Sequence, residues 1–115
     1  DVCSSDLDIQ YVDVRNNGCI KDLPVDSAVE VACRITANGP QPIATGELKL
    51  PISGYVHMMK AFERMVCEAA VTGNRDLAVT ALNMNPLCQS DHDANIVIDE
   101  LIEAHKDYLP QFKQS

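Results

Sequence analysis

The sequence predicts an α+β fold in which a small antiparallel sheet is followed by three helices. Residues 29–35 alternate between apolar and other side chains, as expected of a strand with one buried face. After Pro51 the apolar residues recur at three- and four-residue intervals, which is the period of an amphipathic helix. Strands that precede helices along a chain, without alternating with them, are typical of α+β domains.

The first half of the chain contains the expected strands. A short strand is predicted at residues 10–14, ahead of the strand at 29–35. Asn38-Gly39 can supply the positive φ angles of a tight turn, so the second strand should pair with residues 42–47 through a hairpin. Pro42 has no N–H to donate, so its strand is expected at a sheet edge or to start there.

The second half contains the expected helices. The first is predicted at residues 52–72, with Gly73 placed to end it. Its apolar stripe consists of Tyr55, Met58, Met59, Phe62, Met65, Val66, Ala69 and Ala70. Asn74 is expected to cap a second helix, which stops at Asn85 because the residue before a proline avoids helical angles.

The third helix is expected to open at Ser90, which resembles the start of a capping box with Asp93. Its stripe contains Val97, Leu101, Ala104 and Tyr108, widened by Ile98, Ile102, His105 and Leu109. His105 and Lys106 suit the negative end of the helix dipole, and Pro110 is predicted to close the helix.

Charge and hydropathy exclude two classes of partner. The formal net charge is −8, and no basic patch is present that would bind nucleic acid. The longest apolar runs are far shorter than the ~20 residues that a membrane span needs, and an acidic surface repels anionic lipid. We therefore expect a soluble protein with neither nucleic acid nor a membrane as a partner.

The cysteines indicate a reducing compartment. The chain has five cysteines, which is an odd number, and it has neither a CxxC pair nor a preceding signal peptide. They are Cys3, Cys19, Cys33, Cys67 and Cys88. Scattered cysteines of this kind are usually small buried hydrophobic residues, so we expect a cytoplasmic protein.

The histidines and Cys67 form no recognisable reactive constellation. His57, His92 and His105 lack HxxxH and HExxH spacing, so metal ligation is not expected. His92 is expected in a solvated first turn, whereas His57 can face either way. Glu63 and Cys67 share a helical face and could place a base next to a thiol. A reactive thiol also needs a neighbouring cation, but Arg64 lies about 100° round the helix, so core packing is preferred for Cys67.

One loop, Arg15-Asn16-Asn17-Gly18, is a candidate binding element. Short amides and a glycine let the backbone turn sharply, and such a turn can present N–H groups to a ligand. A plain turn that ends a strand is an equally good interpretation.

Several segments of the chain resemble one enzyme family. In the first half they are Asn16-Asn17-Gly18, Leu23-Pro24, Val29-Glu30-Val31 and the residues from Pro42 to Gly46. In the second half they are residues 68–78, Asn85-Pro86-Leu87 and residues 99–112. Through these segments residues 8–112 resemble glycoside hydrolase family 4, and within it the 6-phospho-β-glucosidases. The chain departs from the family at Ala32, where proline is usual, and at Cys19 and Cys88, where a small apolar residue is usual.

The resemblance implies a fold and a domain organisation. Members of this family resemble lactate and malate dehydrogenases, with a dinucleotide-binding domain followed by a C-terminal α+β domain. They run to several hundred residues, so residues 8–115 are expected to be a C-terminal domain fragment. Residues 1–7 do not continue the family pattern, and we expect them to be a non-native junction segment.

The resemblance also implies NAD- and metal-dependent hydrolysis of phosphorylated disaccharides. In the family, NAD⁺ oxidises the C3 hydroxyl, a base removes the C2 proton, the aglycone is eliminated, water adds and the ketone is reduced. A divalent metal, typically Mn²⁺, polarises the sugar oxygens. The dinucleotide fingerprint and the metal ligands belong to upstream sequence, so this segment alone is expected to be inactive and to bind neither cofactor.

No catalytic or metal-ligating residue is therefore assigned in this chain. Asn16 and Gly18 are carried over as residues of the substrate-site rim, because a similar Asn-x-Gly stretch recurs at this place in the family. The acidic residues Asp99, Glu100, Glu103 and Asp107 are interpreted as a solvated helix face. Carboxylates three or four apart on one helix face the same way, whereas ordinary glycosidases flank the substrate with an acid and a base.

A second hypothesis is a non-catalytic helical module that makes oligomers or binds a partner. Met58, Met59 and Met65 on one helix are compatible with an adaptable apolar surface, although ordinary core packing explains them equally well. Under the enzyme hypothesis the long helices also form part of a subunit interface, so a homo-oligomer is expected in either case.

Overall fold

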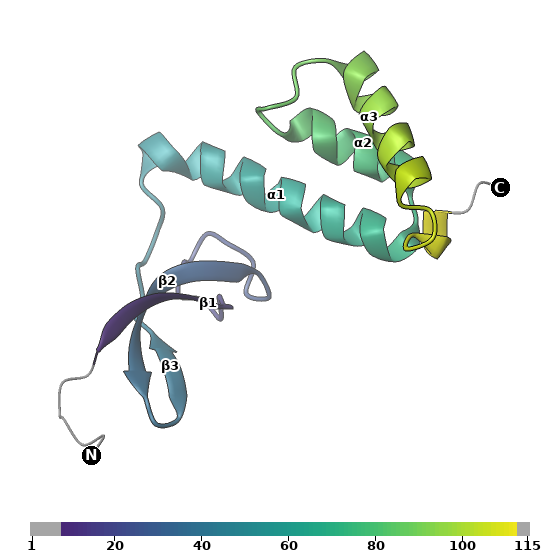
Figure 1. Ribbon diagram of the computed structural model, residues 1–115. Coiled ribbons are helices and arrows are strands. Elements are labelled where there is room, and N and C mark those ends of the chain that lie inside the picture. Colours follow the sequence, from purple (N-terminus) through teal and green to yellow (C-terminus); the bar gives the residue numbers. More distant parts are fainter. Residues whose placement is uncertain (1–7, 113–115) are drawn as a thin grey trace. The chain divides into compact units, whose positions relative to one another are not determined.

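The computed structural model describes residues 8–112, which divide into two compact units at the boundary between Ser53 and Gly54. The first unit contains the sheet and the second contains most of the helices (Figure 1). The sheet-then-helices order confirms the predicted α+β class. The segment 1–7, predicted to be a junction, lies outside the described residues.

The sheet of the first unit has three antiparallel strands in the order β1-β2-β3. They are β1 (Ile9–Arg15), β2 (Ala28–Thr36) and β3 (Gly39–Pro42). Val29, Val31 and Cys33 of β2 are buried while the residues between them are not, which is the predicted alternation. The central strand therefore supplies the core of this unit.

The hairpin partner of β2 was predicted too late in the chain. The prediction was residues 42–47, but β3 ends at Pro42, where its register places Pro42 opposite Cys33. Gly39, with φ of +98°, already belongs to the strand. Directly after β3 the Ile43 N–H still donates to the Ala32 carbonyl of β2 at 2.9 Å. The chain then leaves β2, because the Thr45 and Gly46 N–H groups donate to the Cys19 carbonyl at 3.0 and 3.3 Å. The edge position of Pro42 is confirmed.

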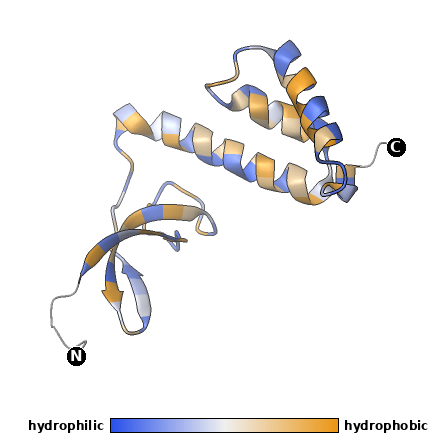
Figure 2. Cartoon of the chain, viewed as in Figure 1, coloured by the Kyte–Doolittle hydropathy of each residue, from blue (hydrophilic) through white to orange (hydrophobic). Residues whose placement is uncertain are grey.

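The long helix α1 (Leu50–Thr72) confirms the first predicted helix and begins two residues earlier than expected. Hydrophobic and hydrophilic residues alternate in bands along it, as in an amphipathic helix (Figure 2). Ala69 is nevertheless its only buried residue. Of the predicted apolar stripe of α1, Tyr55, Val66 and Ala70 are exposed, while Met58, Met59, Phe62 and Met65 are partly buried.

The shorter helices begin as predicted. For α2 (Arg75–Met84), the Asn74 side chain accepts a hydrogen bond from the Leu77 amide at 3.0 Å. For α3 (Asp91–Ala104), the Ser90 hydroxyl accepts from the Asp93 amide at 3.2 Å. These two helices pack directly on one another, whereas α1 contacts them more loosely.

The third helix ends earlier than predicted, at Ala104 instead of just before Pro110. His105, with φ of −113° and ψ of 16°, is its C-cap, and the 3₁₀ turn η1 (Pro110–Phe112) follows. The early end lets the chain fold back, so that the Gln111 side chain donates to the Ala70 carbonyl of α1 at 2.6 Å. Tyr108, expected on the apolar stripe, is consequently 84% exposed.

The turn between α1 and α2 is closely packed against this C-terminal segment. Gly73 has φ of +72°, and a Cβ atom built on it would overlap the Gln111 carbonyl group. Glycine at this position thus both ends α1, as predicted, and permits the close approach of residues 110–112.

No helix among residues 8–112 is both long enough and apolar enough to span a membrane.

Candidate functional site

The loop after β1 is organised by a buried side chain, Asn16, which is 1% exposed. Its amide nitrogen donates to the carbonyls of Ile20, Leu23 and Pro24 at 2.9, 2.9 and 3.1 Å. Its amide oxygen accepts from the Ile20 N–H at 2.8 Å. One side chain thus bonds both the carbonyls and an N–H of a tight backbone turn, because its amide carries two N–H donors beside a carbonyl acceptor.

The backbone around Asn16 adopts left-handed conformations that its sequence favours. Asn17 has φ of +46° and Gly18 has φ of +86°. The backbone N–H groups of Asn16 and Asn17 donate to the backbone carbonyls of Ser27 and Val25, at 2.8 and 3.0 Å. The loop therefore forms a rigid turn that exposes Asn17 and Gly18 while Asn16 lies beneath them.

These contacts refine what each residue of the loop can do. The side chain of Asn16 is fully engaged by the loop, so it can shape a binding surface but does not itself point to solvent. Gly18 has open space where a side chain would be. The assignment of both residues to the rim of a substrate site stays a prediction.

The cysteines differ in burial more than predicted. Cys19 and Cys33 are buried, as expected, but Cys67 is exposed, so its predicted core packing is wrong. Cys67 lies off the apolar stripe of α1, and Glu63, its suggested base, pairs with Lys60. Burial raises the pKa of the Cys33 thiol, and the neighbouring Cys19 raises it further. Cys3 lies outside the described residues.

The histidines are placed as their sequence context indicated. His92 is exposed in the first turn of α3, and His105 is the C-cap of that helix. Within residues 8–112, no group of three or more His, Cys, Asp or Glu side chains lies close enough together to hold a metal ion.

The acidic residues of α3 are partly paired with cations. Asp99 receives two hydrogen bonds from the guanidinium of Arg75, at 2.6 and 2.9 Å, and Lys106 donates to Glu103 at 2.6 Å. The hydrogen bonds from Arg75 lower the pKa of the Asp99 carboxyl below its ordinary value. The Arg75 guanidinium also donates to Asn95 at 3.1 Å, so this pair fastens the start of α2 to α3. The prediction of a solvated face holds, with the addition of this interhelical clamp.

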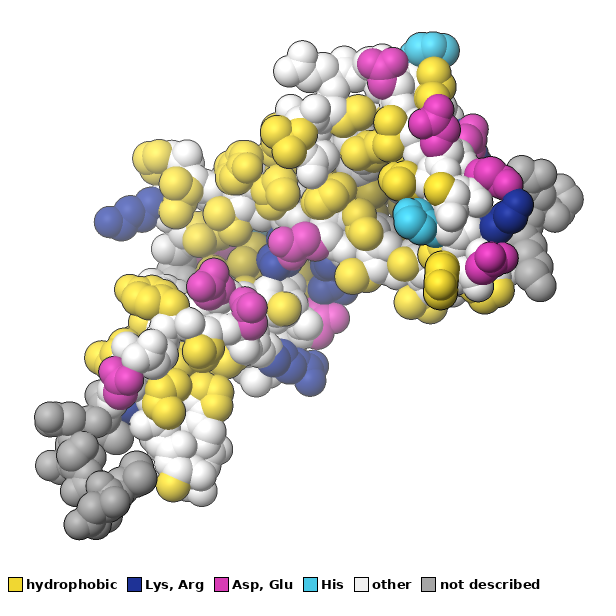
Figure 3. All heavy atoms as spheres, in the orientation of Figure 1, with side chains coloured by type: hydrophobic (Ala, Val, Ile, Leu, Met, Phe, Trp, Pro, Cys, Tyr) yellow, Lys and Arg dark blue, Asp and Glu magenta, His cyan; other side chains and the backbone are white. Residues whose placement is uncertain are grey.

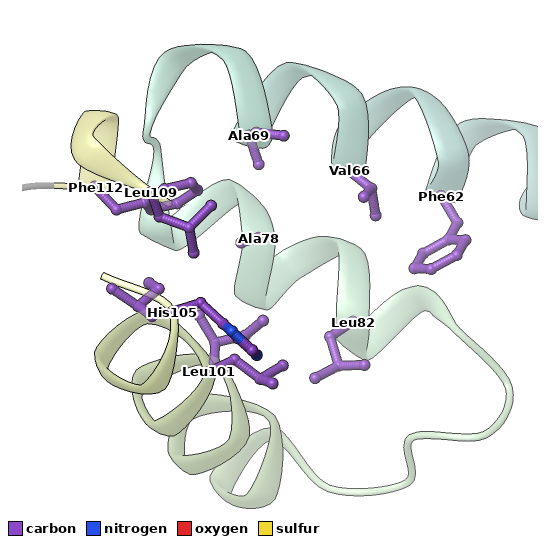
Figure 4. A pocket seen from close by; sticks show the side chains of 12 residues that line it. Phe62, Val66, Ala69, Ala78, Leu82, Leu101, His105, Leu109 and Phe112 are labelled. Carbon is purple, nitrogen blue, oxygen red and sulfur yellow. The ribbon is translucent and has the colours of Figure 1, made fainter. Parts of the chain in front are cut away.

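An apolar groove with a volume of about 360 Å³ lies between the helices of the second unit. Side chains of all three helices and of the C-terminal segment line it. Phe62 and Val66 of α1, Leu82 of α2, Leu101 of α3, and Leu109 and Phe112 point toward the groove (Figure 4). His105 is the only titratable residue of the lining.

The groove was only partly visible in the sequence. Four residues of the predicted first stripe line the groove, namely Phe62, Val66, Ala69 and Ala70, and so do Ile98, Leu101, Ile102, His105 and Leu109 of the predicted stripe of the third helix. Val97, Ala104 and Tyr108, predicted on the latter stripe, do not line it. Phe112 and the turn that carries it were missed, because the early end of α3 brings them back to the helices. On the helical unit hydrophobic side chains gather over a broad area, with Asp and Glu beside them on α3 (Figure 3).

Comparisons with known proteins identify the fold. Residues 2–88 match the family 4 glycosyl hydrolase C-terminal domain. The chain is 52% identical over 105 residues to a protein of Bacillus subtilis named probable 6-phospho-β-glucosidase, a match that covers 91% of this chain and 24% of the relative. It is 36% identical over 104 residues to a 6-phospho-β-glucosidase of Escherichia coli, which covers 89% and 23%.

Solved structures of 6-phospho-glucosidases match the fold of the chain. A crystal structure of a 6-phospho-α-glucosidase from gut microorganisms, in complex with NAD and glucose-6-phosphate, matches with a TM-score of 0.85 at 32% identity. This match covers 92% of the chain and 24% of that protein. The 6-phospho-β-glucosidase of Thermotoga maritima, solved with manganese, NAD⁺ and glucose-6-phosphate, matches with a TM-score of 0.76 at 31% identity, covering 88% and 25%.

The fold and these matches define the class of the chain, an α+β domain of the kind found at the C-terminal end of family 4 glycosyl hydrolases. The chain belongs to glycoside hydrolase family 4, and the part of the family that it matches is the C-terminal domain. It spans about a quarter of the length of the relatives.

Proposed function

We propose that the chain is the C-terminal segment of a cytoplasmic, NAD- and divalent-metal-dependent 6-phospho-β-glucosidase that acts on phosphorylated disaccharides. The observation that carries this proposal is the 52% identity to the Bacillus subtilis relative over 91% of the chain. The β-linked specificity is preferred because the relatives at 52 and 36% identity carry that name, whereas a maltose-6'-phosphate glucosidase matches at 31% and the 6-phospho-α-glucosidase structure at 32%. Hydrolysis by redox-assisted elimination and addition is part of the same proposal.

The described residues of this chain do not fit either cofactor. Residues 8–112 contain no cluster of potential metal ligands and no glycine-rich dinucleotide turn between a strand and a helix. We derive no chemical step for this chain, and we assign NAD and Mn²⁺ to the complete enzyme.

The role that we propose for this segment near the substrate is structural. Asn16 holds the loop that presents Gly18, and the two together form part of the rim of the substrate site. In this proposal Asn16 is a positioning residue, because its amide bonds only to the loop itself. Loss of Asn16 should raise KM for the phosphorylated sugar more than it lowers kcat.

A chimera tests the function. Replacing the matched quarter of the Bacillus subtilis relative by this chain should retain hydrolysis of a 6-phosphorylated β-glucoside, and EDTA or omission of NAD⁺ should abolish it. The unaltered relative and the relative without that quarter are the two controls. A folded chimera without activity, next to an active unaltered relative, contradicts the proposal.

A second candidate function is a non-catalytic interaction module, and the exposed apolar residues Tyr55 and Val66 on the stripe of α1 favour it. This candidate requires self-association or partner binding by the isolated chain. Sedimentation distinguishes the two, since a well-folded and strictly monomeric chain removes the main support for an oligomerisation module.

A further inference from the structure

The sheet unit contains two Asn-Gly pairs, Asn17-Gly18 and Asn38-Gly39. In such a pair the backbone nitrogen of glycine can attack the side-chain carbonyl carbon of asparagine, because glycine has no Cβ atom to hinder the approach. Both asparagines lie in turns and both are exposed. The dipeptide and its access to water therefore do not distinguish the two pairs, whereas the backbone that holds each of them does.

The reaction is deamidation, which converts the side-chain amide into a carboxylate. A bond forms between the glycine nitrogen and the Cγ atom of asparagine, the Cγ–Nδ2 bond breaks, and ammonia leaves with the proton of the glycine N–H. Water then opens the cyclic imide at either carbonyl and gives aspartate or isoaspartate, without any oxidant or reductant. Asparagine is accordingly among the thermolabile residues. The imide closes only when the ψ angle of asparagine rotates to bring the two reacting atoms together.

The first pair is held in a closed turn. Asn17 and Gly18, with φ of +46° and +86°, are its central residues, as in a type I′ turn. The Cys19 N–H closes the turn by donating to the Asn16 carbonyl at 2.8 Å, and the Asn17 N–H donates to the Val25 carbonyl at 3.0 Å. Rotation about ψ of Asn17 displaces the residues that make these bonds.

Asn16 fastens this turn to the loop beneath it. Its buried amide bonds to the backbone of Ile20, Leu23 and Pro24, so the contacts reach up to eight residues along the chain. The turn that carries Asn17 therefore opens only at the cost of hydrogen bonds that are shielded from water.

The second pair lies at the tip of the hairpin between β2 and β3, where local hydrogen bonds hold it. The Asn38 N–H donates to the Thr36 hydroxyl at 3.1 Å, and this hydroxyl donates to the Gly39 carbonyl at 2.9 Å. Two of the four residues of β3 are proline, so this edge strand can donate backbone hydrogen bonds only from Gly39 and Gln41. A short edge strand with few donors opens locally more readily than a loop that a buried side chain closes.

We propose that Asn38 is a site of spontaneous deamidation and that Asn16 protects Asn17 from the same reaction. Water is the only co-reactant. The product carries a new negative charge at the hairpin tip, and its isoaspartyl form adds a methylene group to the main chain there. Protection of Asn17 keeps the main chain of the loop at the length that its hydrogen bonds require.

The experiment incubates the folded 115-residue chain at mildly alkaline pH and follows both sites by peptide mass spectrometry. Each deamidation adds the mass difference between an amino and a hydroxyl group. In the folded chain Asn38 should react at least about tenfold faster than Asn17, because its backbone opens more often. In concentrated urea the two rates should become similar, since neither backbone is then held.

Two variants test the assignment. Asn38→Ala should remove most of the mass increase of the folded chain. Asn16→Ala should make Asn17 react at least about tenfold faster than in the unaltered folded chain and leave the rate at Asn38 unchanged. Circular dichroism shows whether each variant is folded.

The outcomes separate the two parts of the proposal. Equal rates at Asn17 and Asn38 in the folded chain, or a rate ratio that urea leaves unchanged, overturn it as a whole. A folded Asn16→Ala variant in which Asn17 reacts no faster overturns the protective role of Asn16. If Asn16→Ala does not fold, the unaltered chain with and without urea still decides whether the folded backbone protects Asn17.

Discussion

At the scale of single residues, Asn16 contributes more to the stability of the sheet unit than its size suggests. Asn16→Ala should lower the local free energy of unfolding by about 2–4 kcal/mol, because it leaves several buried backbone groups without partners. Amide hydrogen exchange of β2 measures this loss. Asn38→Ala is the matched control, since Asn38 is exposed in the hairpin turn, and exchange that is equally fast in both variants contradicts the assignment.

Glycine has opposite consequences at two positions of the helical unit. Gly73→Ala should destabilise the chain by at least about 1–2 kcal/mol, because the residue is left-handed and its Cβ would overlap Gln111. Gly54→Ala should instead stabilise α1 by about 0.5–1 kcal/mol, because Gly54 is helical and has open space around it. Urea unfolding followed by circular dichroism measures both, and a Gly73→Ala variant as stable as the unaltered chain would contradict the packing of the C-terminal segment on Gly73.

At the scale of elements, the clamp between α2 and α3 should make the helical unit sensitive to acid. The folded pKa of Asp99 lies below its ordinary value of 3.8, so its contribution to stability is present above that pH and is lost as the pH falls through the folded pKa. Asp99→Asn should therefore lose stability at pH 7 and flatten the acid part of the stability curve. Urea midpoints from neutral to acidic pH test this.

The control for the clamp lies next to it in the sequence. Glu100→Gln removes an exposed carboxylate of the same helix that is not part of the clamp with Arg75, and it should leave the acid dependence nearly unchanged. If Asp99→Asn and Glu100→Gln have the same pH profile, the ion pair with Arg75 contributes nothing measurable to the packing of α2 on α3.

At the scale of the whole molecule, cofactor binding should require more than this chain. A ligand that binds only the native state raises the Tm. Added MnCl₂ and NAD⁺ should leave the Tm of the 115-residue chain unchanged and should raise that of the chimera. Thermal scans with and without each ligand measure this, and a rise for the 115-residue chain would mean that a site lies within it.

Local sequence determined the elements of this protein. The alternation in β2, the stripe of α1 and the caps at Asn74 and Ser90 were all predictable, because each depends on residues within one turn or one strand. The segments around Asn16 and after Gly73 also sufficed to indicate the family, which the match over residues 2–88 then established.

Tertiary structure decided where elements end and what their faces meet. Pro110 was expected to end α3, but contacts of Gln111 and Phe112 with other helices favour an end at Ala104. The hairpin likewise ended early because Thr45 and Gly46 bond to Cys19. The role of Asn16, the clamp of Arg75 on Asp99 and the groove depend on residues distant in sequence, and pattern within a short segment carries no information about such pairs.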